Sequence, residues 1–299
     1  MTAAFLAAAL ACPLFAEQAA PSRTIRIGIA DARGKIQEIK KLDLEEYLLG
    51  VLPNEMDPDW PIEALKAQAV VARTFSYSHL GKHNAQGFDL TNDTRSQVYL
   101  RPKANAESVS GAVRSTRGEV LGFGGELLTV YYHSCCGGRT TDPQEVWKSG
   151  QPTPRPLRGV KDGFCSLSPH HNWTAYFADD DIMAALARSH SVAGPLEAVR
   201  IASRDKAGYA REFKILLESG EIKLPANQLR SLLGGTELKS ARILQIKRRS
   251  KGIEFHGRGN GHGVGLCQWG ARLLAQKGRS YESILRHYFP GATLSIVTE

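Results

Sequence analysis

The chain has 299 residues, of which 42% are hydrophobic, so it is long enough to bury one large core or two smaller ones. It contains no internal repeat or low-complexity tract, and we expect a globular protein. The net charge of +8 suits an anionic polymer. We expect no nucleic-acid partner, because the longest basic run is KRR and no aromatic-and-basic alternation accompanies it.

The N-terminal stretch MTAAFLAAALACPLFAEQ is apolar and of signal-peptide length, too short to span a bilayer as a permanent helix. We expect residues 1–20 to be an export signal cleaved after Ala16, which predicts a location in the cell envelope, periplasm or cell wall. The stretch lacks a basic start, so a buried N-terminal helix is the alternative. Cys12 is a poor lipid acceptor, and we expect membrane association only if it is lipidated.

The first third of the chain combines a hairpin with two helices. The alternation in TIRIGIA, residues 24–30, predicts a strand paired with the segment after Gly34. Helical spacing in DLEEYLLGVL predicts a helix that ends at Pro53, followed by a loop, NEMDPDW. A long helix is predicted from Pro61 to Gly81, and its many alanines imply close packing.

The rest of the chain interleaves both kinds of element. Residues 87–140, including TRSQVYL, are typical of short strands around one small helix, and residues 141–173 are irregular. We predict an α+β (mixed α/β) protein of helices and short, mostly antiparallel strands. Its expected parts are a region 21–174, an inserted β-rich subdomain 175–250, and a C-terminal region 251–299 that completes the first.

Glu55 is the acid with the most suggestive surroundings. Pro53, Met56 and Trp60 flank it just ahead of the long helix. An apolar wall there would raise the pKa of the carboxyl and make it a general acid. An exposed loop glutamate is the alternative.

The segment GRGNGHGVGLCQWGA, residues 257–271, places glycine at every second position around His262 and then adds Cys267, Gln268 and Trp269. Glycine allows positive φ and a close approach of the backbone to a ligand. The pattern GxGxxG fits no register of these glycines, which excludes a dinucleotide fingerprint. We expect a loop that lies close to a ligand.

Beyond the N-terminal stretch the chain has four cysteines, Cys135, Cys136, Cys165 and Cys267. An even number suggests disulfides in an exported protein. The adjacent Cys135 and Cys136 are poorly placed to form a disulfide with each other, however. The sequence HSCC also places an imidazole beside two thiols, so metal binding is a second interpretation.

A series of motifs extends these observations over most of the chain. LEEYLLGVLPNEM, WPIEALKAQAVVARTFS, TRSQVY, VYYHSCCGGRT, EVW, FCSLSP, GNGHGVGLCQWGA and YESILRHYFPG follow one another in this order. The chain thereby resembles the stage II sporulation protein D (SpoIID/LytB) family over roughly residues 24–170 and 196–294. Enzymes of this family are lytic transglycosylases that cleave peptidoglycan glycan strands, preferring strands without stem peptides.

The resemblance implies that Glu55 acts first as general acid and then as base, cleaving MurNAc–GlcNAc bonds to leave 1,6-anhydro-MurNAc ends. The sequence offers no convincing second carboxylate, and this chemistry requires none. The alternative within the family is a non-catalytic wall-binding protein or an activator of a partner amidase, as in the LytB branch. A cysteine hydrolase is a weaker alternative, because no family pattern supports it.

Five further side chains are expected at the glycan: Arg73, Gln97, Tyr99, His262 and Gln268. The guanidinium of Arg73 matches carboxylate geometry, although pairing with a structural acid explains it equally well. Gln97 and Tyr99 could bind sugar or belong to the core, and Trp269 is expected in the core.

The resemblance also implies a structural zinc held by cysteines and histidines near the active site. Cys136, Cys165 and His133 are the expected ligands, with Cys135, His170 and His171 as competitors. A Cys136–Cys165 disulfide is the alternative. The sequence departs from the family pattern at Cys135 and Cys267.

Overall fold

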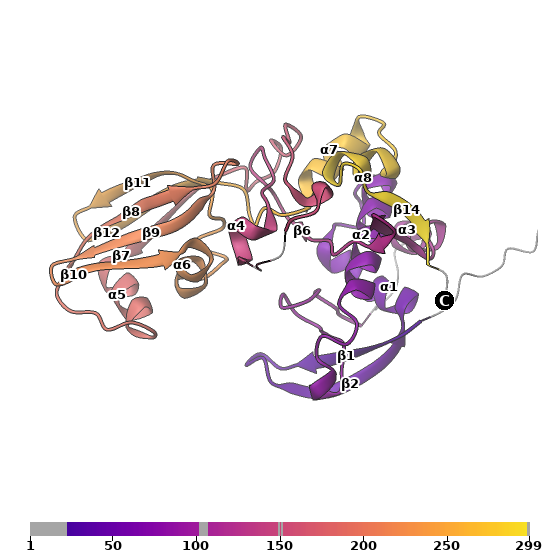
Figure 1. Ribbon diagram of the computed structural model, residues 1–299, viewed down its shortest axis with the longest axis horizontal. Coiled ribbons are helices and arrows are strands. Elements are labelled where there is room, and N and C mark those ends of the chain that lie inside the picture. The colour runs from indigo at the N-terminus through magenta and orange to yellow at the C-terminus, as the bar shows by residue number, and fades with distance from the viewer. Residues whose placement is uncertain (1–22, 102–106, 149, 151, 298–299) are drawn as a thin grey trace, which may run out of the picture.

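The computed structural model describes residues 23–101, 107–148, 150 and 152–297, so the expected export signal lies outside it. The protein consists of two lobes joined by a narrower central region (Figure 1), one mainly helical and one mainly of strands. The predicted α+β class is confirmed. None of the helices in these ranges has the length and apolar character needed to cross a membrane.

The helical lobe is built around α2 (Ile62–Ser78), which contacts the neighbouring helices and β4. Its alanines are buried, as the close packing of several helices requires. The surrounding helices are α1 (Leu44–Glu55), α3 (Glu107–Ser115), α7 (Gln268–Gln276) and α8 (Tyr281–Tyr288).

Small sheets cover the edges of this lobe. One sheet has the order β2–β1–β3, with an antiparallel hairpin as predicted, and another has the order β14–β4–β5. The strands are β1 (Thr24–Ala30), β2 (Ile36–Asp43), β3 (Leu90–Thr91), β4 (Glu119–Phe123), β5 (Glu126–Leu127) and β14 (Thr293–Ile296).

The β-rich lobe has its own hydrophobic core, which includes residues from Trp173 to Phe255. Two three-stranded sheets, β10–β9–β8 and β11–β12–β7, enclose it with two helices. The elements are β7 (Asn172–Ala178), α5 (Asp179–Ala187), β8 (Leu196–Arg204), β9 (Ala210–Leu217), β10 (Gly220–Pro225), α6 (Ala226–Leu233), β11 (Ile243–Arg249) and β12 (Gly252–Arg258). This lobe therefore extends a few residues beyond the expected 175–250.

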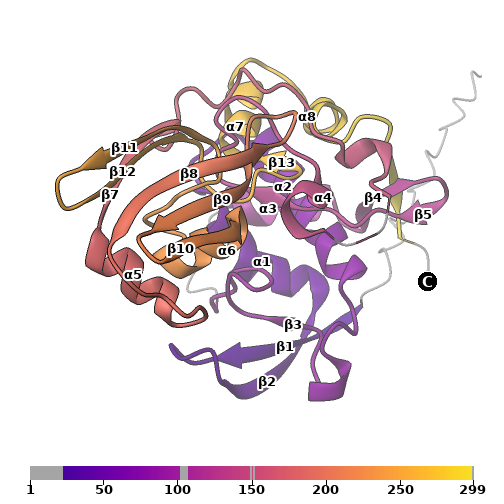
Figure 2. The ribbon, with the colours of Figure 1, turned by 60° about the vertical axis from the view of Figure 1, so that its left-hand side comes forward.

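The central region joins the lobes through short elements. β6 (Tyr132–His133) pairs in parallel with β13 (Leu266–Cys267), and α4 (Pro143–Trp147) contacts α6 of the β-rich lobe. Figure 2 places α4 and α6 next to each other, with the helices of the first lobe behind. Short 3₁₀ turns occur at Asn84–Gln86 and Arg155–Leu157.

Two local predictions were wrong. The first helix does not end at Pro53 but continues to Glu55, and the Met56 N–H closes its last turn on the Leu52 carbonyl. The segment TRSQVYL is irregular rather than a strand, because its backbone bonds to scattered partners: Tyr99 N–H to the Asn92 carbonyl and Leu100 N–H to the Gly50 carbonyl.

Arg73 connects three segments of the helical lobe from a fully buried position on α2. Its Nε and Nη2 donate to the two carboxylate oxygens of Glu45, each at 2.7 Å. The guanidinium also donates to the carbonyls of Glu119 and Val113, at 3.2 and 3.3 Å. The expected substrate contact of Arg73 is therefore replaced by the alternative, a pair with a structural acid inside the core.

We predict that Arg73→Gln lowers the free energy of unfolding by about 3–5 kcal/mol, because it leaves the Glu45 carboxylate without its buried partner. Chemical denaturation measures this change. The double variant Glu45→Met/Arg73→Met should recover part of the loss. Arg249→Gln, which removes an exposed pair with Glu254, serves as the control and should leave the midpoint unchanged. Equal effects of Arg73→Gln and Arg249→Gln would contradict the assignment.

Candidate functional site

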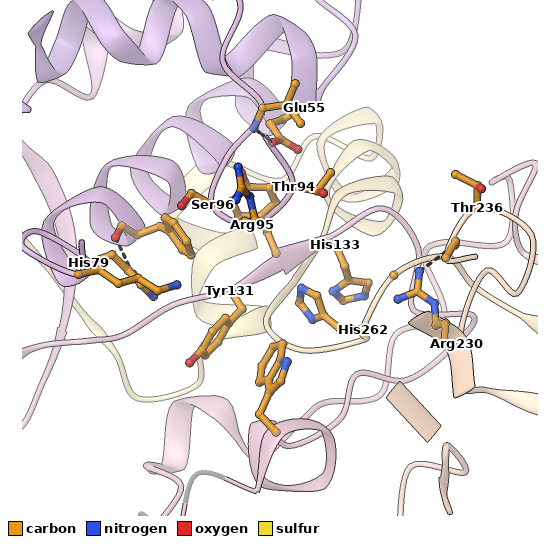
Figure 3. Close-up of a pocket in the computed structure, with 17 residues that line it drawn as sticks. Glu55, His79, Thr94, Arg95, Ser96, Tyr131, His133, Arg230, Thr236 and His262 are labelled. Carbon is orange, nitrogen blue, oxygen red and sulfur yellow. Dashed lines mark hydrogen bonds between the residues drawn. The ribbon is translucent and has the colours of Figure 1, made fainter. Parts of the chain in front are cut away.

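A cavity of about 850 Å³ lies between the two lobes, with Glu55 on its wall. Figure 3 shows Glu55 beside the loop of Thr94, Arg95 and Ser96, with His133 and His262 in the middle and Arg230 reaching in from the β-rich side. The lining residues are Glu55, Phe75, His79, Lys82, Thr94, Arg95, Ser96, Val98, Tyr131, Tyr132, His133, Trp147, Arg230, Gly235, Thr236, Gly261 and His262. Glu55 is the one acid in this set, which also contains three cations.

The Glu55 carboxyl lies at the end of α1 and is partly buried. Burial raises its pKa above the ordinary value. The Val98 N–H donates to Oε1 at 3.1 Å, and this bond, with the neighbouring polar side chains of Tyr132 and Gln268, offsets part of the rise. The net direction favours the protonated form, which a general acid needs.

Gln268 begins α7 and is buried close to Glu55. Its amide is the donor that faces the Glu55 carboxyl and helps to offset the rise in the pKa of that group. The structure thus places Gln268 next to Glu55, and its expected contact with the glycan stays a prediction.

Gln97 and Tyr99 lie behind the cavity wall. Gln97 Nε2 donates to Ser76 Oγ at 3.0 Å, and Gln97 Oε1 accepts from the Tyr132 hydroxyl at 3.2 Å. Tyr99 stacks on Tyr47 with the ring centroids 5.3 Å apart. Both residues occupy the core position that was the alternative for them, and Gln97 positions Tyr132 against Glu55.

His133 and His262 are neighbouring rings in the cavity, 5.5 Å apart. Burial lowers the pKa of His133 to about 4 and that of His262 to about 3, so both are neutral near pH 7. His133 Nδ1 lies 3.0 Å from the Val264 carbonyl, so Nδ1 carries the proton. Its Nε2 is then an acceptor, and it has no partner within the described ranges.

The glycine-rich loop brings its backbone against the strand that carries His133. Gly261 has φ of +107°, and a Cβ there would lie 2.8 Å from the His133 Cβ. Gly265 has φ of +74°, and a Cβ there would lie 2.0 Å from the Tyr131 carbonyl oxygen. The loop backbone therefore packs closely on His133 and Tyr131, and the expected approach to a ligand stays a prediction.

A cluster of thiols lies next to this loop. The sulfur atoms of Cys136, Cys165 and Cys267 and a carboxylate oxygen of Asp162 lie within 4.8 Å of one another, and all four residues are buried. A second set within the same limit is Cys135, Cys165 and His171. The cysteines are free, with 3.6 Å between the sulfurs of Cys136 and Cys165, too far for the alternative disulfide.

The donor set fits a zinc ion. Thiolate, imidazole and carboxylate are the ligands that zinc takes in proteins, and a buried set without an open side is typical of a structural site. Neighbouring thiols that donate to Cys165 lower its pKa, which favours the thiolate. Of the three expected ligands, Cys136 and Cys165 lie together in the first set, whereas His133 is in neither set and lines the cavity. His170 is in neither set.

Sequence reasoning missed three contributors to the site. Asp162 was not considered a ligand, although its position three residues before Cys165 could have suggested it. Trp147 lies in the EVW motif and faces the cavity beside Tyr131, with ring centroids 4.7 Å apart. Arg230 comes from α6 of the β-rich lobe, to which the sequence had assigned no chemistry.

Comparison with known proteins defines the family. A family model described as stage II sporulation protein matches residues 32–123. An uncharacterized protein of Brachyspira hyodysenteriae is 36% identical over 86% of this chain and 67% of its own length. The chain belongs to the stage II sporulation protein D family. The stage II sporulation protein D of Bacillus amyloliquefaciens is 28% identical over 86% of this chain and 75% of its own length.

The amidase enhancer of Bacillus subtilis is a further relative, 31% identical over 83% of this chain. The match covers 40% of the amidase enhancer, so this chain corresponds to less than half of that longer protein.

We predict that Glu55→Gln stabilises the protein at pH 8 but not at pH 4. Because the pKa of Glu55 is raised, its contribution to stability is complete below the ordinary glutamate pKa of about 4.3 and declines as the pH rises through the raised value. Each tenfold increase in the proton affinity of the carboxyl on folding changes the free energy of unfolding by about 1.4 kcal/mol. Thermal melts from pH 4 to pH 8 measure the difference. The exposed Glu38→Gln is the control, and a pH-independent effect of Glu55→Gln would contradict the burial of the carboxyl.

Proposed function

We propose that the protein is a peptidoglycan lytic transglycosylase, with Glu55 as its general acid and then base. The family and the relatives support a cell-wall-related role and an envelope location. The observation that carries the enzymatic proposal is the single carboxyl with a raised pKa on the wall of a large, otherwise basic cavity. This pattern suits a reaction that needs one acid and a polyanionic substrate.

In the proposed reaction the protonated Glu55 donates its proton to the glycosidic oxygen between MurNAc and GlcNAc. The bond breaks through an oxocarbenium-like state, and the ionised Glu55 then removes the proton from the 6-hydroxyl of the same MurNAc as that oxygen attacks C1. No water is consumed, and a 1,6-anhydro end forms. Tyr132 and Gln268 hold the carboxyl in place, and the neutral His133 offers its Nε2 as an acceptor to the sugar.

One observation favours the non-catalytic alternative. A relative named amidase enhancer suggests that the chain assists a partner amidase at the glycan strand, which the same cavity could bind without cleavage. A cysteine hydrolase is not supported, because all four cysteines in the described ranges are buried and none lines the cavity.

We predict that the purified protein releases 1,6-anhydro muropeptides from amidase-stripped sacculi and that Glu55→Gln reduces this release at least about a hundredfold. Mass spectrometry of the products measures it. Glu38→Gln should cleave normally, and release should fall as the pH rises above the raised pKa of Glu55, because the acid form is lost. Reducing ends instead of anhydro ends would indicate hydrolysis. Sacculus binding without products would favour the amidase-assisting alternative.

We also propose that a structural zinc is held by Cys136, Asp162, Cys165 and Cys267. His171 and Cys135, which form the second set with Cys165, are the alternative ligands. When bound, the metal would supply a cross-link between the segments that contain these residues and take no part in proton transfer. Cys267 directly precedes Gln268, so the ligands lie next to a residue that contacts Glu55.

We predict about one zinc per chain in protein purified without chelators, and a melting midpoint that a chelator lowers by about 5 °C or more. Elemental analysis and thermal melts test this. Cys136→Ser and Asp162→Asn should lose metal, whereas His133→Gln, which alters the neighbouring cavity, should retain it. Loss of metal from His133→Gln alone, or no metal in the wild-type protein, would contradict the ligand set.

A further inference from the structure

A second cavity of about 430 Å³ adjoins the first on the side of the β-rich lobe. Residues of α4, α6 and the start of β9 line it. The two cavities share five lining residues, namely Thr94, Trp147, Arg230, Gly261 and His262. The shared wall makes them two chambers of one continuous cleft, and Arg230 is the cation common to both.

Arg230 differs from the other arginines of the cleft in its partners. Arg95 pairs with Asp93, and Arg211 pairs with Glu145. Arg230 donates from Nε to the Leu238 carbonyl at 2.9 Å and from Nη2 to a second carbonyl at 3.0 Å. No acidic side chain of the described residues pairs with it, and burial lowers the pKa of its guanidinium.

These contacts leave a positive charge that is partly buried and not neutralised. Removing a charge from water is costly unless an opposite charge compensates for it. The two backbone carbonyls fix the plane of the guanidinium but carry no net charge. The guanidinium reaches the cleft (Figure 3), close enough to the neutral His262 for its charge to contribute to the lowered pKa of that ring. An anionic ligand would supply the missing charge, and a guanidinium fork suits a carboxylate.

The neighbouring aromatic wall indicates what carries the carboxylate. Trp147 is 41% exposed and is packed at an angle against Tyr131 and His262, with the ring centroids 4.7 and 5.0 Å away. A partly exposed indole held in this way offers an apolar face to the ring of a sugar. An aromatic face and a cation at the same point of the cleft fit a sugar that carries an acid.

We propose that Arg230 binds a free carboxylate on a sugar of the glycan strand, so that the strand extends from the Glu55 chamber into the chamber of the β-rich lobe. The proposal rests on the proposed function for the identity of the ligand as a glycan. It makes the β-rich lobe part of substrate recognition and Arg230 a specificity-determining residue.

The test measures binding in the Glu55→Gln variant, which removes turnover. Calorimetry compares three probes: a GlcNAc–MurNAc tetrasaccharide with free lactyl carboxylates, the same sugar with those carboxyls amidated, and the neutral N-acetylglucosamine tetramer. We expect the free acid to bind about ten- to a hundredfold more tightly than either neutral probe, as for a hydrogen bond to a charged group. The double variant Glu55→Gln/Arg230→Gln should lose this difference in affinity between the acidic and neutral probes. Glu55→Gln/Arg230→Lys should retain part of it.

Arg249→Gln, on the outer β11 strand, is the matched control and should keep the full preference. The proposal is overturned if Arg230→Gln keeps the preference, if it weakens all three probes equally, or if none of the probes binds. Thermal melts of each variant exclude unfolding as the cause. A wild-type protein without anhydro products but with an Arg230-dependent preference would refute the proposed chemistry and leave this inference intact.

Discussion

The parallel pairing of Tyr132–His133 with Leu266–Cys267 is the constraint on which the site depends. It joins segments about 130 residues apart and brings the residues in and just after the two strands close together. Tyr132 comes to Glu55 from one strand, and Gln268, directly after the other strand, comes to it as well. The same pairing places Cys136 and Cys267 in one cluster. The catalytic candidate and the thiol cluster are therefore two consequences of one short sheet.

The glycines make this pairing sterically possible. A side chain at Gly265 would collide with the Tyr131 carbonyl, and one at Gly261 would press on His133. Positive φ at both positions also restricts the choice of residue. The unusual composition of the loop thus reflects backbone packing beside the cavity, and its His262 is held there by a bond from the Val264 N–H.

Arg73, which is buried, and Arg230, which is partly buried, illustrate how surroundings assign a role. Arg73 and Arg230 both lie on helices, but Arg73 is neutralised by Glu45 and cross-links the helical lobe. Within the part of the chain that the structure describes, Arg230 donates only to backbone carbonyls, and it faces the cleft. A paired charge supports the fold, whereas a positioned charge without a counter-ion is available to a ligand. The β-rich lobe thereby gains a part in the site.

Local patterning determined much of this protein from the sequence alone. The hairpin and the long helix follow from periodicity and turn chemistry, which act over a few residues. The apolar wall expected from Pro53, Met56 and Trp60 was a local inference too, but none of these residues lines the Glu55 cavity. Tertiary structure decided which residues meet. Glu45 lies 28 residues from Arg73, Asp162 lies far from Cys267, and α6 brings Arg230 to the cleft from another lobe. Such contacts depend on how distant segments pack, and no local pattern encodes them.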